Sequence, residues 1–329
     1  MTTSNGGKNM KLSKKILAAL SAAALIATTA LFASCSDDED DDKNGTAYVT
    51  LPESVGENPL KGKTWQITST ENEEEMTISW AFTDTTATYT ESETDSKYIE
   101  TYKYSYDANK KLLYLALLSV SNSWTEDGET ISYSWSSVEE YVELAKKEAE
   151  EYGESISEDA MERFIEYTKQ EFSTRGVRKY TIGEANSLTL ERYFDGNLPT
   201  ACRFYKSFGE SELPSEYTSG DISLDQIWFE DSDRTDYCYD YNLSFNSEAK
   251  TFSGKLYSQT RADGEEWSDT TKLGTVTGTY TTEGIGTSGC KVTLTFTSLP
   301  DGVPALIKTG TAYELEQSSG SGLTYTLVK

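Results

Sequence analysis

The sequence contains no histidine, although it has 55 Asp and Glu side chains among its 329 residues. Without an imidazole it lacks Ser-His-Asp triads, Cys-His dyads, HExxH motifs and histidine-ligated zinc sites. Carboxylates are so frequent that no pair stands out as an acid–base dyad. Asp231, Asp233 and Asp236 lie close together, but this stretch lacks the glycine and distal glutamate of an EF-hand loop. We expect a solvated acidic loop there, and we predict no catalytic residue, metal site, cofactor or enzymatic activity.

The four cysteines are the other reactive side chains. Cys202 and Cys290 alternate with apolar residues and are expected to point inward, whereas Cys238 alternates with Asp240 and is expected to point outward. These three thiols cannot all pair, and their spacing matches no metal motif. We expect reduced, packed cysteines, and one disulfide among the three is the open alternative. Cys35 differs from them because it separates an apolar run from an acidic one.

Residues 1–34 have the layout of a secretory signal peptide. Three lysines between positions 11 and 15 precede an uncharged run over 16–32, and two small residues stand directly before Cys35. The stretch Leu-Phe-Ala-Ser-Cys at 31–35 resembles a bacterial lipobox, in which the cysteine is acylated and the chain is cut before it. The resemblance implies an exported protein that a lipid on Cys35 anchors to the bacterial outer membrane.

An acidic run over residues 36–42 follows the cysteine. Such a run cannot fold and repels anionic headgroups, so we expect residues 35–57 to form a lipidated cysteine and a disordered tether. The acidic patch also resembles the surface-export signal of some Gram-negative lipoproteins, and a plain solvated tether is equally compatible. The net charge of −26 argues against nucleic-acid binding. The expected partners are the membrane, through Cys35, and a protein or a small apolar ligand.

Alternating apolar and polar residues predict strands in most of the remaining chain. The stretch at 75–82 places Met, Ile, Trp and Phe on one face, and tyrosines recur in phase over 98–106. The stretch at 111–118 is almost continuously apolar, which is typical of a strand buried on both faces. The fold class we predict is mainly β (α+β), with two antiparallel β-barrel or sandwich domains.

Between residues 137 and 175 the apolar residues change to a helical spacing. Ser137 stands three residues before Glu140, as in a capping box, and a second helix is predicted to begin near Ser157. This pattern predicts a helical hairpin inserted among strands. We favour a packing element that covers the open end of a sheet, and the other interpretation is a lid over a barrel mouth.

The predicted boundaries place a first β domain at 58–208, a linker at 209–221 and a second β-barrel or sandwich domain at 222–329. The linker is rich in Gly, Ser and Glu. Similar Tyr- and Thr-rich stretches at 179–191 and 312–327 are compatible with a duplicated module, and chance similarity is the alternative.

The stretch NPLKGKTWQIT at 58–68 resembles the start of lipocalin-like bacterial lipoproteins, in which a glycine and then a tryptophan open the first strand. The usual spacing has one residue between the two, whereas two residues separate Gly62 from Trp65 here. The resemblance implies a small barrel with a tight entry at Gly62 and with Trp65 as a plug of its closed end. The candidate ligand-binding residues of such a barrel are Trp65, Trp80, Tyr89, Tyr102 and Tyr104.

Two classes of function are compatible with these observations. We favour protein–protein interaction or adhesion at the cell surface, because side chains as numerous as these aromatic ones tend to fill the barrel that they line. The alternative is a lipocalin-like carrier or receptor that binds a small apolar ligand or a glycan in the barrel.

The lipobox predicts the effect of one substitution. Cys35→Ala removes the acylated thiol, so we expect the variant to leave the membrane fraction or to remain uncleaved. Detergent phase partitioning and the mass of the purified protein measure both effects. Cys202→Ala is the control and should keep the lipid. A Cys35→Ala protein with the wild-type partitioning and mass would contradict the lipoprotein hypothesis.

Overall fold

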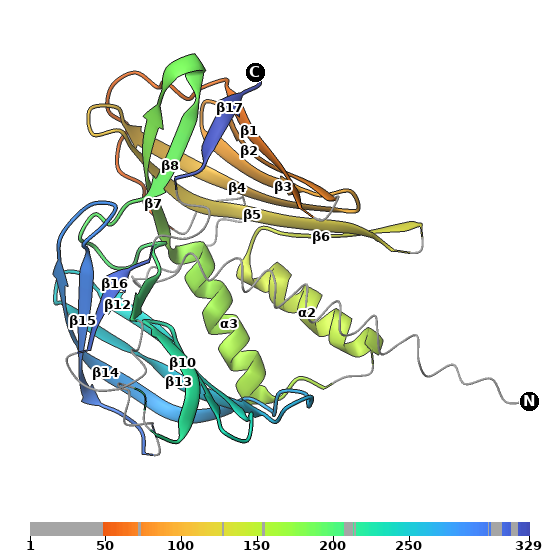
Figure 1. Ribbon diagram of the computed structural model, residues 1–329, viewed down its shortest axis with the longest axis vertical. Helices are drawn as coiled ribbons and strands as arrows, with labels where there is room; N and C mark the ends of the chain where they lie inside the picture. Colours follow the sequence, from red (N-terminus) through yellow and green to blue (C-terminus); the bar gives the residue numbers. More distant parts are fainter. Residues whose placement is uncertain are drawn as a thin grey trace, which may run out of the picture.

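The computed structural model describes residues 49–71, 74–126, 128–152, 155–206, 213, 215–301, 303, 311–316 and 322–329. These residues form two antiparallel β-sheets and two helices, and the fold is mainly β as predicted. Figure 1 shows the first sheet above the second, with the helices beside the region where the two approach each other. The predicted signal peptide, Cys35 and the predicted tether up to residue 48 lie outside the described residues. The end of the expected disordered tether is ordered instead, because Val55 forms a β-bridge with Asp107 and its backbone N–H donates to the Tyr106 carbonyl at 2.8 Å.

The first sheet has the strand order β4-β3-β2-β1-β17-β8-β7-β5-β6. Because β4 also pairs with β5, eight of these strands close into a ring, which we call the first barrel. Strand β6 lies outside this ring and pairs with the second half of β5. The strands are β1 (Thr64–Glu71), β2 (Glu74–Phe82), β3 (Thr86–Ser92), β4 (Ser96–Asp107), β5 (Leu112–Glu126), β6 (Glu129–Trp135), β7 (Arg175–Ile182), β8 (Leu188–Arg192) and β17 (Thr324–Leu327).

The second sheet is a closed barrel with the strand order β10-β11-β12-β13-β14-β15-β16-β9, and we call it the second barrel. Its interior is filled by apolar side chains, among them Ile227, Leu243 and Val276, which have no exposed surface. Such filling is typical of eight-stranded barrels. The strands are β9 (Phe204–Lys206), β10 (Tyr217–Ser223), β11 (Gln226–Asp231), β12 (Asp236–Asn246), β13 (Thr251–Arg261), β14 (Thr271–Glu283), β15 (Lys291–Ser298) and β16 (Thr311–Leu315).

The strand pairing differs from the predicted boundaries in three places. Strand β17, expected in the second domain at 222–329, lies between β1 and β8 of the first barrel. Strand β9, expected in the first domain, pairs with β10 and β16 of the second barrel. Strand β10 begins inside the expected linker at 209–221, whose residues 209–212 and 214 lie outside the described part of the chain. Alternation identifies a strand, but the neighbour that accepts its backbone hydrogen bonds is determined by the tertiary fold.

The predicted strands at 75–82, 98–106 and 111–118 correspond to β2, β4 and β5. In the third of these, Leu112 and Leu113 are both buried, as expected for a strand covered on both faces. The similar stretches at 179–191 and 312–327 have different roles. The first forms the β7–β8 hairpin, whereas the second contributes β16 to the second barrel and β17 to the first.

The predicted helical hairpin consists of α2 (Val138–Tyr152) and α3 (Glu158–Ser173). The Ser137 hydroxyl accepts the backbone N–H of Glu140 at 3.2 Å, and the Ser157 hydroxyl accepts that of Ala160 at 3.3 Å. The Glu140 carboxylate accepts the N–H of Ser136, so the reciprocal bond of the predicted capping box forms one residue earlier. Both helices begin where the sequence predicts because these hydroxyls satisfy N–H groups of the first turn.

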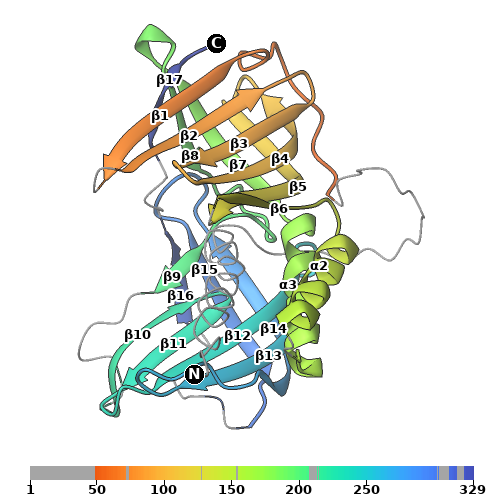
Figure 2. The same ribbon diagram turned by 90° about the vertical axis from the view of Figure 1, so that its right-hand side faces the viewer.

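The hairpin contacts both barrels (Figure 2). On the side of the first barrel, Tyr141 of α2 stacks on Trp135 of β6 with 4.3 Å between the ring centroids. On the side of the second barrel, Glu162 of α3 binds Lys255 at 2.8 Å and Lys272 at 2.9 Å, and the two lysines lower the pKa of this carboxyl to about 2. The hairpin is therefore a packing element between the barrels.

Cys202, Cys238 and Cys290 are all buried and free. Tyr241 and Leu243 of β12 belong to the barrel core, so Cys238 faces outward as predicted. It is nevertheless buried because α3 covers this face of the barrel, where Arg163 forms an ion pair with Asp240. The Cys238 side chain therefore points away from the barrel interior without being exposed to solvent.

The core of the first barrel predicts a stability effect at Trp80, which is 6% exposed. Trp80→Ala should destabilise the protein by about 3–5 kcal/mol, because a large buried side chain leaves a cavity. Trp267→Ala is the size-matched control, since Trp267 is 37% exposed, and it should cost much less. Urea unfolding measures both variants, and equal losses of stability would contradict the packing described here.

Candidate functional site

One end of the first barrel is closed by apolar side chains. Trp65 is fully buried, and its indole N–H donates to the backbone carbonyl of Asn186 at 2.7 Å. Its ring packs nearly perpendicular to that of Phe82, with 5.7 Å between the ring centroids. Gly62 enters this end with a φ of +72°, a conformation that a side chain would strain. The Trp65 side chain therefore fills this end of the barrel, as the sequence analysis expected.

Tyr104 belongs to the same closed end. Its hydroxyl donates to the Thr83 carbonyl at 2.8 Å and accepts from the Asn58 amide at 2.7 Å. Of the five residues predicted to bind a ligand, Trp65 and Tyr104 thus form the floor of the barrel, since both are buried and hydrogen-bonded.

The other three predicted residues lie next to one another above this floor. The Trp80 ring packs against the Tyr89 ring and stacks on the Tyr102 ring, with 5.1 Å and 6.0 Å between the respective ring centroids. Trp80 is buried, whereas Tyr89 and Tyr102 retain accessible surface. The Tyr89 hydroxyl donates to Glu91 on the same strand face, so polar groups begin at this level of the barrel.

Further from the floor, β4 carries a carboxylate between two tyrosines. Glu100 alternates with Tyr102 and Tyr104, so it faces the barrel interior. The Tyr98 hydroxyl donates to one carboxylate oxygen of Glu100 at 2.8 Å, and the Tyr102 hydroxyl donates to the other. Burial raises the pKa of Glu100, and these two hydrogen bonds oppose the rise. All three side chains retain accessible surface.

Two arginines occupy the wall formed by β7 and β8. Arg178 and Arg192 are register partners, and Arg178 alternates with the buried core residue Tyr180, so both guanidinium groups are on the inner face. The Nη1 atom of Arg178 is buried without a hydrogen-bond partner. The charge of Arg178 lowers the pKa of Glu100, but less than the tyrosine hydrogen bonds do.

Helix α3 adds a carboxyl group that interacts electrostatically with Glu100. Glu171 lies next to Phe172, which is buried in the core shared by α2, α3 and β4–β6. Burial, and secondarily the charge of Glu100, raises the pKa of Glu171 to about 8. Glu171 is therefore mostly protonated at neutral pH and can donate a hydrogen bond as well as accept one.

The structure thus adds three polar residues that the sequence analysis did not select. Glu100 is hydrogen-bonded to Tyr102, and Arg178 and Glu171 interact electrostatically with Glu100. Glu100 is in phase with the tyrosines of 98–106, and Arg178 is in phase with Tyr180, so alternation could have identified both. The site offers aromatic rings, carboxyl groups and guanidinium groups, which is a set suited to binding.

The acidic stretch at Asp231, Asp233 and Asp236 forms a turn. The Asp231 carboxylate accepts the backbone N–H groups of Asp233 and Thr235, both at 2.9 Å, and Asp236 forms an ion pair with Arg261. Across the part of the chain that the structure describes, no three His, Cys, Asp or Glu side chains are arranged to hold a metal ion.

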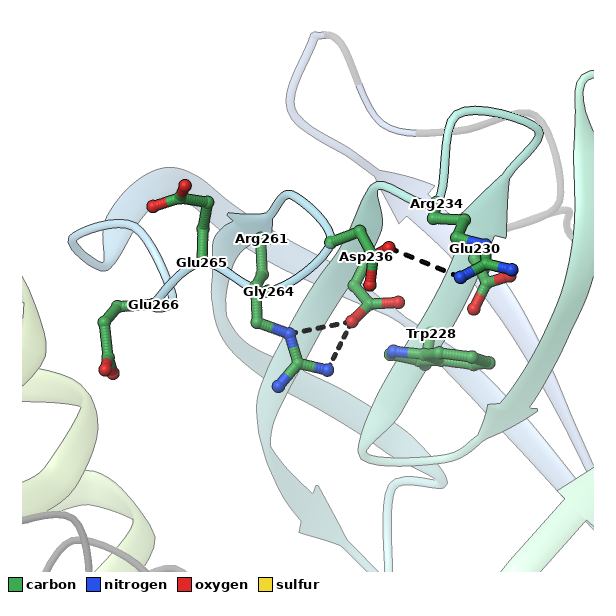
Figure 3. Close-up of a pocket in the computed structure, with 9 residues that line it drawn as sticks. Trp228, Glu230, Arg234, Asp236, Arg261, Gly264, Glu265 and Glu266 are labelled. Carbon is green, nitrogen blue, oxygen red and sulfur yellow. Dashed lines mark hydrogen bonds and ion pairs between the residues drawn. The ribbon is translucent and has the colours of Figure 1, made fainter. Parts of the chain in front are cut away.

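A hollow of about 520 Å³ lies on the outside of the second barrel (Figure 3). Arg261 donates to Asp236 through two nitrogens, and its guanidinium lies 4.6 Å from the ring centroid of Trp267. Figure 3 shows the Trp228 indole next to the Asp236 carboxylate. The lining residues are Trp228, Glu230, Arg234, Asp236, Arg261, Asp263, Gly264, Glu265 and Glu266.

The chain matches no protein-family model, and neither a curated protein nor a solved structure shows significant similarity to it. Among the helices of the described residues, none combines the length and the apolar character needed to cross a bilayer.

The raised pKa of Glu171 predicts a pH dependence of stability. Between the ordinary value of 4.5 and the folded value of about 8, ionisation stabilises only the unfolded chain, so stability falls as the pH rises through this range. Glu171→Gln removes this loss. We expect similar stability of both proteins at pH 4 and an advantage of the variant of at least about 2 kcal/mol at pH 8.

Urea unfolding at pH 4, 6 and 8 measures this effect. The control is Glu158→Gln, at an exposed position in the first turn of the same helix, and it should leave the wild-type pH profile unchanged. An identical profile for Glu171→Gln and wild type would show that Glu171 ionises normally in the folded protein.

Proposed function

We propose that this protein is a non-catalytic binding protein that holds a small ligand in the open half of the first barrel. The observation that carries the proposal is the contrast between the two halves of the barrel. Trp65 and Tyr104 fill the floor, whereas the inward-facing Tyr89, Glu100 and Tyr102 keep accessible surface. Aromatic walls with a few convergent polar groups are typical of small-molecule sites.

The second barrel supports this assignment by contrast. Its inward-facing residues Tyr241, Leu243 and Phe245 on β12 are all buried, and the same holds for Val292 and Leu294 on β15. A barrel filled in this way leaves no interior for a ligand. We assign to it a supporting role, since it holds α3 at the mouth of the first barrel through Glu162, Lys255 and Lys272.

The proposal includes the cellular location expected from the sequence. We propose that the protein is exported and that a lipid on Cys35 anchors it to the bacterial outer membrane, with the acidic run at 36–42 as a spacer. A ligand-binding module on such a tether would capture molecules near the membrane surface. The absence of histidine from the sequence supports a role without catalysis.

The second candidate is interaction with another protein, and the hollow on the second barrel favours it. Arg261 lines this hollow and stacks on Trp267, which is 37% exposed. Tryptophan and arginine are enriched where proteins bind each other. In this case the first barrel would bind no ligand, and the surface near Trp267 and Arg261 would form the contact.

A neutral fluorescent probe distinguishes the two candidates. Prodan, an uncharged naphthalene dye, should bind saturably and one-to-one with a blue-shifted emission if the open half of the first barrel accepts ligands. Ile78→Trp should abolish this binding, because Ile78 packs against the first-barrel core and the larger ring would fill the open half.

The matched control is Thr77→Trp on the same strand, since alternation places Thr77 on the outer face, and it should bind prodan normally. Circular dichroism confirms that both variants are folded. Weak, non-saturating binding to the wild-type protein would exclude the carrier function and leave the interaction surface as the better candidate.

A further inference from the structure

We infer that the ligand of the first barrel is a small aromatic zwitterion, with an amino group and a carboxylate group as in an aromatic α-amino acid. This inference rests on the proposed function, because it names the chemical class of the ligand held in the open half of the first barrel. It is based on the distribution of charge across the barrel and on the position of the aromatic rings.

The two walls of the open half carry opposite charges. Glu91 and Glu100 lie on β3 and β4, whereas Arg178 and Arg192 lie across the ring on β7 and β8. In the strand order, β2, β1 and β17 separate the acidic wall from the basic one on one side, and β5 separates them on the other. An amino group near the first wall and a carboxylate near the second would each meet an opposite charge.

The carboxylates are arranged to accept a cationic donor. Glu100 already accepts two tyrosine hydroxyls, and these bonds orient both of its oxygens while leaving further lone pairs for an ammonium group. Tyr98 and Tyr102 also present aromatic faces, which attract a cation. Burial and the charge of Glu91 both act to raise the pKa of Glu100, so a bound cation would relieve an unfavourable environment.

The opposite wall can receive a carboxylate. Arg178 has a buried Nη1 atom without a hydrogen-bond partner, which is an unusual state for a guanidinium group in a protein interior. Burial, and after it the charge of Arg178, lowers the pKa of Arg192, its register partner on the neighbouring strand. A carboxylate of the ligand beside Arg178 would supply the acceptor that this Nη1 atom lacks.

The space between the walls is suited to a ring. Trp80, Tyr89 and Tyr102 form one aromatic cluster at this level, and the two tyrosines retain accessible surface on which a planar group can stack. At the mouth, the protonated Glu171 of α3 would add a hydrogen bond without adding a full charge. The ligand must be small, because Trp65 and Tyr104 close the barrel directly below.

Four probes that share one phenyl ring test this inference: L-phenylalanine, phenethylamine, 3-phenylpropionate and 2-phenylethanol, each measured by displacement of prodan at pH 7. We expect phenylalanine to bind at least about tenfold more tightly than either singly charged probe, since each added charge-assisted hydrogen bond is worth about that factor. Equal or tighter binding of phenethylamine or of 3-phenylpropionate would overturn the inference.

Two substitutions assign the charges to their walls. Arg178→Gln should reduce the affinity for phenylalanine by about tenfold and leave that for phenethylamine unchanged, because only the carboxylate loses its partner. Glu100→Gln should weaken phenethylamine and spare 3-phenylpropionate. The controls are Lys179→Gln and Glu191→Gln. These two residues follow Arg178 and precede Arg192 in the sequence, pair with each other across β7 and β8, and lie on the outer face of the barrel. Their substitution should alter none of the affinities.

The outcomes separate this inference from the proposed function. If prodan binds but the four phenyl probes compete equally, the barrel binds ligands and the zwitterion assignment is wrong. If prodan does not bind the wild-type protein, the proposed function fails and the assignment fails with it. Retained prodan binding by Arg178→Gln and Glu100→Gln shows that these variants are folded.

Discussion

Closure of the first barrel depends on β17, which follows the second barrel in the sequence but pairs with strands of the first. Strand β17 forms hydrogen bonds with β1 on one side and with β8 on the other, so it closes the ring between elements from opposite ends of the sequence. The second barrel is therefore an insertion between β8 and β17. This insertion is compatible with a closed first barrel because β9 and β16, the first and last strands of the second barrel, pair with each other. The chain enters and leaves the inserted barrel at neighbouring points, which is the geometry that domain insertions require.

The two barrels use similar strand architecture for different interiors. In the second barrel, the inner face is apolar from end to end, and its aromatic rings pack edge to face, as between Phe245 and Tyr280 at 5.2 Å. In the first barrel, the inner face changes along the axis from tryptophan and phenylalanine at the floor to glutamate and arginine near the mouth. Buried charges oppose folding unless they are paired or hydrogen-bonded. Their presence at this level of the first barrel is the reason why we propose a binding site there.

Helix α3 connects the two parts energetically. One side of the helix packs Phe164 and Phe172 into the core under β5 and β6, and the other side binds the second barrel through Glu162, Arg163 and Gln170. The Gln170 amide donates to the backbone carbonyl of Leu243 at 3.2 Å, in a buried position. The position of α3 beside β5 of the first barrel is thus fixed by contacts with the second barrel. We expect that any movement of the hairpin would require the two barrels to shift relative to each other.

The sequence by itself determined the local structure of this protein. Period-two alternation was sufficient for β2 and β4, and a nearly continuous apolar run was sufficient for β5. Helical spacing with Ser137 and Ser157 was sufficient for the hairpin, because each of these signals depends on neighbours within a few residues. Of the candidate site, Trp80, Tyr89 and Tyr102 were selected from the sequence as aromatic residues of the expected lipocalin-like barrel.

Only the tertiary structure decided how these elements combine. A strand pattern does not specify which backbone will accept its hydrogen bonds, so the assignment of β9 and β17 to their barrels required the fold. The burial of Cys238 depended on α3, which lies more than sixty residues away in the sequence. The arrangement of the polar residues in the candidate site also depends on the tertiary fold. Glu100, Glu171 and Arg178 lie on β4, α3 and β7, and their charges act on one another only because ring closure and helix packing bring them into one interior.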